Sequence, residues 1–105
     1  MYARVSPIEA DGGSFDEAAI TTMREDMVPK VLGMPGNVGL IMLHDIGGGR
    51  GMSITLWEDE DAVRASDQAA AALREDATAQ HNAKQTAASH AFKVTGFDLK
   101  PDVTA

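Results

Sequence analysis

The segment 52–57 alternates between apolar and polar positions with a period of two, as a β-strand does. One face carries Met52, Ile54 and Leu56, and the other carries Ser53, Thr55 and Trp57. The apolar face must be buried. The second face is mildly polar and ends in the only tryptophan, so we expect it to face a covered and partly polar space. The pattern therefore predicts a strand with a pocket beside it.

Three further segments have strand patterns. The segment 2–9 alternates and contains Pro7, which predicts a strand that lies near the sheet edge or ends there. The segment 37–46 is apolar on both faces, so we expect it to be covered on both sides. A fourth strand is predicted over 87–99, after a polar connector at 81–85 that contains His81. In that strand His90, Phe92 and Val94 oppose Ala91, Lys93 and Thr95.

A first helix is predicted from Ser14, because Ser14 and Glu17 have the spacing of a capping box. Its inner face repeats every four residues, and Pro29 is expected to kink its last turns. That face comprises Phe15, Ala19, Met23, Met27 and Val31, flanked by Ala18 and Ile20. Methionines at helical spacing are typical of core packing, but they also form adaptable ligand surfaces, so Met23 and Met27 are candidate pocket residues. The segment 33–36 ends the helix.

A second helix is predicted as one element from Asp59 to Gln80. The acidic run 58–61 lies at its start, where exposed backbone N–H groups favour negative charge. Consecutive acids on a helix point in different directions, which disfavours a metal site. The inner stripe is narrow and comprises Ala62, Val63, Ala69, Ala70, Leu73 and Ala77. These small side chains either bring the helix close to the sheet or leave free volume beside Trp57.

The predicted order is strand, helix, strand, strand, helix, strand, which is the ferredoxin-like βαββαβ arrangement. We expect one α+β domain over residues 1–105, with two helices on one face of a four-stranded antiparallel sheet. The other face, apolar in the second and third strands, needs a cover, and an identical subunit supplies it most economically. A homodimer is therefore expected. The tail 100–105 is expected to fray.

Charge and composition narrow the classes of partner. The net charge is −7 and the isoelectric point is near 4.7, which argues against nucleic acid and anionic membranes. The chain has no cysteine, no stretch long enough to span a membrane and no apolar leader at its start, so we expect a cytoplasmic protein. The glycine-rich segment 47–51 is followed by a strand instead of a helix, which favours a hairpin loop over a phosphate site.

The chain resembles the dimeric α+β barrel proteins related to the antibiotic biosynthesis monooxygenases. The resemblance rests on Gly33-Met34-Pro35-Gly36, on the glycine-rich hairpin, and on the run from Ser53 through Trp57 and Asp59 into 61–66. It covers nearly the whole chain. It implies a homodimer in which two sheets face each other, with a cleft between sheet and helices in each subunit. The superfamily includes cofactor-independent oxygenases of aromatic polyketides, haem-degrading enzymes and proteins with no known reaction.

The resemblance also suggests site residues. Trp57 matches a tryptophan that catalytic members carry at the end of the third strand, and Ser6 stands where an asparagine is expected on the first strand. Near the histidine that ligates iron in haem-degrading members, this chain offers Ser66, Asp67 and Gln68, none of which is a usual haem ligand. Oxygenase chemistry without a cofactor requires a cleft that fits the substrate and excludes water, with a base or hydrogen-bonding groups along its wall. Arg4, Ser6, Thr55 and Trp57 are the candidates for that wall.

Two of the three histidines are further candidates. His44 near the end of the second strand and His90 in the fourth strand could each line the cleft as a base or a ligand contact. Asp45 cannot easily orient His44, because adjacent strand residues point to opposite faces. No pair of histidines has the spacing of a metal site, so we expect neither a metal nor a cofactor.

Two function classes remain open from the sequence. The first is a cofactor-independent oxygenase that acts on an aromatic or polyketide-like compound. The second is a non-catalytic dimer that shelters a small hydrophobic ligand or fills its cleft with its own side chains.

Overall fold

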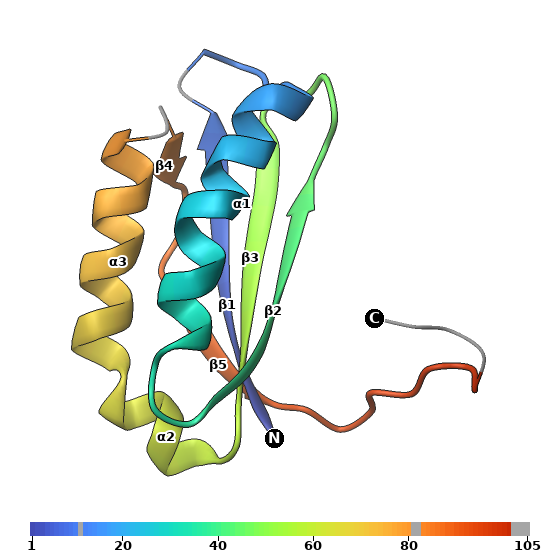
Figure 1. Cartoon of the computed structure of the whole chain (residues 1–105), viewed down its shortest axis with the longest axis vertical. Coiled ribbons are helices and arrows are strands. Elements are labelled where there is room, and N and C mark those ends of the chain that lie inside the picture. The colour runs from blue at the N-terminus through green and yellow to red at the C-terminus, as the bar shows by residue number, and fades with distance from the viewer. Residues whose placement is uncertain (11, 81–82, 102–105) are drawn as a thin grey trace.

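The computed structural model describes residues 1–10, 12–80 and 83–101. The elements follow the order β1 (Tyr2–Ala10), α1 (Glu17–Leu32), β2 (Asn37–His44), β3 (Arg50–Trp57), α2 (Glu60–Ala65), α3 (Asp67–Gln80), β4 (Ala83–Gln85) and β5 (His90–Lys93). The strands form one antiparallel sheet in the order β2-β3-β1-β4, and β5 also pairs with β1. Helices α1 and α3 run along one side of this sheet (Figure 1). The ferredoxin-like α+β architecture is confirmed.

Pro7 lies in a central strand, so the expected edge position is wrong. β1 pairs with β3 on one side and with β4 and β5 on the other. The Pro7 carbonyl accepts a hydrogen bond from Thr86 N at 3.2 Å, so the missing Pro7 N–H faces that same side. The ladder is interrupted there, because β4 ends at Gln85 and β5 begins at His90. A central proline is tolerated because its neighbour strand is split opposite it.

This split also corrects the expected fourth strand. Instead of one strand over 87–99, the chain forms a short β4 within the expected polar connector and a four-residue β5. Beyond β5, residues 94–100 form no strand (Figure 1). His81 and residues 102–105 lie outside the described residues.

The expected second helix is two helices. α2 ends at Ala65 and α3 begins at Asp67, with Ser66 between them. The Ser66 hydroxyl donates to the Val63 carbonyl at 2.9 Å, and Arg4 Nη2 of β1 donates to the same carbonyl at 2.8 Å. Side-chain donors thus satisfy a carbonyl near the end of α2, and the helix is interrupted beside the sheet.

The first helix begins later than expected. Its N-cap is Asp16, whose carboxylate accepts a hydrogen bond from Ala19 N at 2.7 Å, so the predicted Ser14 capping box is wrong. Phe15 lies outside the helix, bridged to Ile46 and buried. Ala19 is exposed, whereas Met23, Met27 and Val31 form the buried face as predicted.

The glycine-rich loop is packed against the segment before α1. Phe15 N donates to the Gly48 carbonyl at 2.8 Å, and Ala10 N donates to the Gly49 carbonyl at 2.8 Å. A Cβ on Gly49 would lie 2.8 Å from the Gly13 oxygen, so this close approach requires glycine. The hairpin expectation is confirmed, and the glycines have a structural reason to be there.

The second face of the sheet is not covered by any helix of the described chain. Cross-strand partners on this face include Val5, Ile54 and Ile41, followed by Pro7, Met52 and Leu43. Leu43 is 49% exposed, and Phe92 in β5 is 54% exposed. The described chain therefore covers β2 on one side only, and the second cover, expected from an identical subunit, stays a prediction. Among the described residues, no helix is long and apolar enough to cross a membrane.

Candidate functional site

Trp57 lies at the end of β3 and is fully buried. Its indole Nε1–H donates a hydrogen bond to Thr55 Oγ1 at 2.9 Å. The two residues share one face of the strand because they are two positions apart. The sequence predicted a covered, partly polar space on this face, and the burial and hydrogen bond of Trp57 agree with that prediction.

Arg4 connects Trp57 to the junction between α2 and α3. Its guanidinium carbon lies 5.5 Å from the centroid of the Trp57 ring, within the range of a cation–π contact. Besides the Val63 carbonyl, Arg4 Nη2 contacts Ser66 Oγ at 3.3 Å and forms an ion pair with Asp67. Arg4 is only 4% exposed, so this charge is buried between sheet and helices. Arg4 therefore fixes both the helix junction and one side of the tryptophan.

Two small cavities lie between the sheet and the helices. The methionine cavity has a volume of about 30 Å³ and is lined chiefly by Ser6, Ile8, Met23, Met27, Met42 and Gln85. The tryptophan cavity has a volume of about 20 Å³ and is lined chiefly by Thr55, Trp57, Met34, Val31, Ala70 and Leu73. Four residues line both cavities, namely Ser6, Met27, Ser53 and Arg74. Each has room for about one water molecule, so a larger ligand enters only if side chains move.

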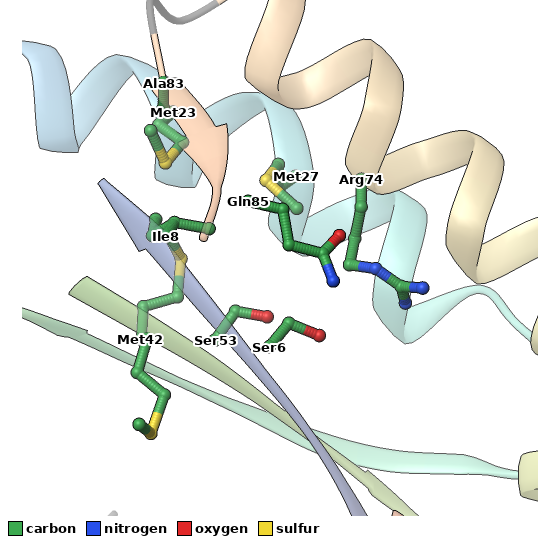
Figure 2. Close-up of a pocket in the computed structure, with 10 residues that line it drawn as sticks. Ser6, Ile8, Met23, Met27, Met42, Ser53, Arg74, Ala83 and Gln85 are labelled. Carbon is green, nitrogen blue, oxygen red and sulfur yellow. The ribbon is translucent and has the colours of Figure 1, made fainter. Parts of the chain in front are cut away.

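Figure 2 shows how the polar groups are arranged around the methionine cavity. The hydroxyls of Ser6 and Ser53 rise from neighbouring strands. The side chains of Gln85 and Arg74 extend toward the sheet from β4 and α3, and the guanidinium of Arg74 turns to the right of the two hydroxyls in this view. Ser6 Oγ lies 2.7 Å from Ser89 Oγ, and Gln85 Nε2 donates to Ser89 Oγ at 3.2 Å. These groups connect the interior with the loop between β4 and β5.

A third, open hollow lies outside the interior cavities, and we call it the outer pocket. It has a volume of about 330 Å³ and is lined by Arg4, Asp67, Arg74, Ser89, His90 and Ala91. Arg74 lines this pocket and both interior cavities. The guanidinium of Arg74 thus lies between the outer pocket and the interior.

The eight residues predicted from the sequence fall into three groups. Ser6, Thr55, Trp57, Met23 and Met27 line the interior cavities. Arg4 and the exposed His90 line the outer pocket. His44 lines neither of these and instead lines two open grooves elsewhere.

His44 packs edge-on against Phe15, with ring centroids 4.8 Å apart. Burial lowers the pKa of His44 below its ordinary value of 6.5, which favours the neutral imidazole. Its Nε2 atom is buried and has no hydrogen-bond partner among the described residues. His44 lines neither the methionine cavity nor the tryptophan cavity. Met42 lines both the methionine cavity and one of the two grooves that His44 lines, so this side chain separates His44 from the interior.

The positions near a haem-ligating histidine are otherwise engaged. Ser66 and Asp67 both bind Arg4, and Gln68 is exposed. Within the described part of the chain, no cluster of three or more His, Cys, Asp or Glu residues could hold a metal ion. The residues at this place are not suited to binding haem iron.

No protein-family model matches the chain. The chain is 31% identical over 75 residues to the uncharacterized protein Rv2557 of Mycobacterium tuberculosis, a match that covers 71% of this chain and 33% of that protein. It is 35% identical over 77 residues to the uncharacterized protein Rv2558 of the same organism, covering 73% of this chain and 32% of that protein. The chain thus spans about a third of the length of these relatives.

Solved structures are similar over nearly the whole chain. The cofactor-independent oxygenase SnoaB of Streptomyces nogalater superposes with a TM-score of 0.62 at 16% identity, covering 91% of this chain and 95% of that one. The monooxygenase ActVA-Orf6 of Streptomyces coelicolor, in complex with nanaomycin D, superposes with a TM-score of 0.57 at 16% identity, covering 94% of this chain and 91% of that one. The chain has the antibiotic biosynthesis monooxygenase-like fold. The haem degrader MhuD of Mycobacterium tuberculosis, with two haems bound, superposes with a TM-score of 0.60 at 22% identity, covering 95% of this chain and 100% of that one.

On this monooxygenase-like fold, the chain carries polar cleft residues that sequence reasoning missed. Ser53, Arg74, Gln85 and Ser89 were not among the predicted site residues. Arg74 is the most informative of them, because it follows Ala70 by four positions and so shares the inner face of the helix. An arginine within an otherwise alanine-rich inner face was a usable signal. Gln85 and Ser89 had no such signal, because the splitting of the fourth strand placed them.

Proposed function

We propose that this chain is a cofactor-independent monooxygenase-type module that acts on an aromatic or polyketide-like compound in the cleft between sheet and helices. The observation that carries the proposal is the arrangement around Trp57. A fully buried indole, a fixed Thr55 hydroxyl and the Ser6 and Ser53 hydroxyls share one face of the sheet, and Arg74 lies opposite them. The similarity in fold to oxygenases that act on small molecules supports it.

The reaction is the oxidation of an acidic ring CH₂ group to a ketone. The substrate loses a proton, passes electrons to dioxygen, and one oxygen atom enters the product while the other leaves as water. The described residues that line the two interior cavities include no carboxylate and no imidazole. In the absence of such a base, the cationic Arg74 stabilises the substrate anion. The Ser6 hydroxyl relays the proton to the Ser89 hydroxyl, 2.7 Å away, and from there it passes to solvent water, the final acceptor. Trp57 and the methionines supply shape and exclude water.

Arg4 has an indirect part in this proposal. It is engaged with Val63, Ser66 and Asp67, and it packs over Trp57. Its contribution is to position the tryptophan and to raise the positive potential of the cleft. Met23 and Met27 adapt to the ligand because their side chains have flexible torsions. His90 contributes at the outer pocket, and His44 contributes only where a ligand extends past Met42.

The second candidate function is non-catalytic, and one observation favours it. The two interior cavities are small, at about 30 and 20 Å³, so the cleft is nearly filled by its own side chains. A protein that merely packs its core in this way needs no substrate.

Oxygen consumption with an anthrone-type substrate distinguishes the two functions. We expect turnover by the wild type and a loss of about tenfold to a hundredfold in Trp57→Phe, Ser6→Ala and Arg74→Gln. The first two remove a hydrogen-bonding group from the cleft, and the third removes its positive charge. Arg24→Gln is the matched control, since Arg24 is exposed on α1 and lines neither interior cavity. Wild-type protein without turnover above the protein-free rate would support the non-catalytic function. Turnover at equal rates in all variants would contradict the roles assigned to Trp57, Ser6 and Arg74.

The proposed assembly is a homodimer in which the uncovered sheet faces pair. The apolar side chains Val5, Ile41 and Ile54 lie at adjacent register positions there, and the exposed Leu43 and Phe92 extend the surface. Light scattering should give twice the chain mass, and Leu43→Asp should weaken the association while Leu32→Asp, at a similarly exposed position on α1, should not. A monomer at micromolar concentration would contradict the dimer. The cytoplasmic location is likewise a proposal, motivated by the absence of cysteine.

A further inference from the structure

Arg4 has more hydrogen-bonding capacity than its neighbours use. Its Nη2 atom makes the contacts with Val63, Ser66 and Asp67. Its Nη1 atom is buried and has no hydrogen-bond partner among the described residues. An unpaired buried donor on a charged group is costly, so an acceptor supplied by a ligand would stabilise this nitrogen.

Arg74 also has a buried side-chain nitrogen that is not hydrogen-bonded within the described chain. Its Nε atom is buried without a hydrogen-bond partner among the described residues. Burial lowers the pKa of Arg74, the nearby charge of Arg4 lowers it further, and Asp67 raises it. The two guanidinium groups thus repel each other. The Asp67 side chain, which forms an ion pair with Arg4, is 65% exposed, so water screens its compensating charge. A second anion would relieve this repulsion.

The outer pocket brings these groups together. Arg4 and Arg74 both line it, together with the Ser89 hydroxyl and the exposed imidazole of His90. Its volume of about 330 Å³ is open, so a small ligand reaches it from solvent. The surroundings are locally cationic in a chain whose net charge is −7. The net charge of the molecule therefore repels anions, and an anion that binds in this pocket is attracted by the local charge.

We propose that the outer pocket binds the carboxylate of an aromatic acid between Arg4 and Arg74, with the ring directed past Arg74 toward the interior cavities. Two arginines and Asp67 leave one uncompensated positive charge, which matches a monovalent carboxylate better than a phosphate dianion. The flat guanidinium groups also match the planar carboxylate. The inference rests on the proposed cleft function and adds the substrate class: the compound oxidised there carries a carboxylate.

Binding of benzoate, followed by NMR, tests this site directly. The single tryptophan gives a single indole N–H signal. Because Arg4 packs over the tryptophan ring, the position of this signal is sensitive to an anion that binds to Arg4. Benzoate should shift the signal saturably. Benzamide, which has the same shape without the charge, should bind at least about tenfold more weakly, because charge-assisted hydrogen bonds are lost.

Variants at Arg74 connect the shift to the outer pocket. Arg74→Gln should weaken benzoate binding by about tenfold or more, and Arg74→Lys should weaken it less, because it keeps the charge but not the planar fork. Arg24→Gln makes the same change in net charge on α1 and should leave the affinity within about twofold. If Arg74→Gln does not fold, Arg74→Lys still gives the comparison with Arg24→Gln.

Three results would overturn the inference. They are equal binding of benzamide and benzoate, equal affinities in Arg74→Gln and Arg24→Gln, and displacement of benzoate by inorganic phosphate at lower concentration than by acetate at matched ionic strength. The last result would assign the pocket to phosphate groups instead. Because this experiment measures binding, its failure is distinct from a failure of the oxygen assay, which uses a neutral anthrone.

Discussion

The guanidinium of Arg4 lies 5.5 Å from the centroid of the Trp57 ring and donates to the Val63 carbonyl at 2.8 Å. One side chain from β1 therefore contacts the tryptophan of the candidate cleft and the last turn of α2. Arg4→Met keeps much of the volume but removes these polar contacts. We expect it to lower the free energy of unfolding by about 2 to 4 kcal/mol, measured by urea denaturation. Asp67→Asn is the control, and we expect a loss below about 1 kcal/mol because Asp67 is largely exposed. Equal losses in both would show that the ion pair alone is responsible.

Thr55 is the hydrogen-bond acceptor for the buried indole of Trp57, at 2.9 Å. Thr55→Val preserves the shape of the side chain but leaves the indole N–H without this partner. We expect a loss of about 1 to 3 kcal/mol in urea denaturation and a shift of the indole signal. Thr55→Ser keeps the hydroxyl, so its signal should stay near that of the wild type. If Thr55→Val were as stable as Thr55→Ser, the hydrogen bond would contribute little to the fold.

Gly36 combines a φ of +79° with close packing against α2. A Cβ at this position would lie 2.5 Å from Ala62 Cβ, so Gly36→Ala brings both backbone strain and a steric clash. We expect a destabilisation of about 2 to 4 kcal/mol, visible as a lower thermal midpoint. Gly12→Ala is the matched control, because a Cβ at Gly12 would meet nothing within 4 Å. A neutral Gly36→Ala would contradict the observed packing of the α1–β2 turn on α2.

His44 gives the fold a dependence on pH. Burial holds its pKa in the folded state below 6.5, so the unfolded chain binds the proton more readily. Above the pKa that His44 has in the unfolded chain, the imidazole is neutral in both states and costs no stability. As the pH falls from that value toward the pKa of His44 in the folded state, the free energy of unfolding decreases. We expect a lower urea midpoint at about pH 5.5 than at about pH 7.5. His44→Gln should show a smaller fall, and an equal fall in both proteins would assign the effect to other groups.

The sequence by itself determined the class of fold and one wall of the cleft. The alternation around Trp57 and the four-residue spacing of Met23, Met27 and Val31 depend on the periods of strand and helix, which are local properties. For the same reason the hairpin at 47–51 and the uncovered apolar sheet face could be predicted. Thr55 and Trp57 share one face of a single strand, which the period of two predicts, whereas Ser6 was suggested by the resemblance to the family.

Tertiary structure alone decided where the second helix and the fourth strand are interrupted, and which charged side chains meet in the candidate site. Whether β1 was central, and therefore whether the strand opposite Pro7 had to split, depended on pairing between segments about 80 residues apart in the chain. That split placed Ser89 against Ser6. Likewise Arg4 reaches α2 only because the helices pack on that face of the sheet, where it meets Ser66 and approaches Arg74. Propensities and periodicity describe neighbours along the chain, whereas the meeting of two arginines in the outer pocket is a property of the packed sheet and helices.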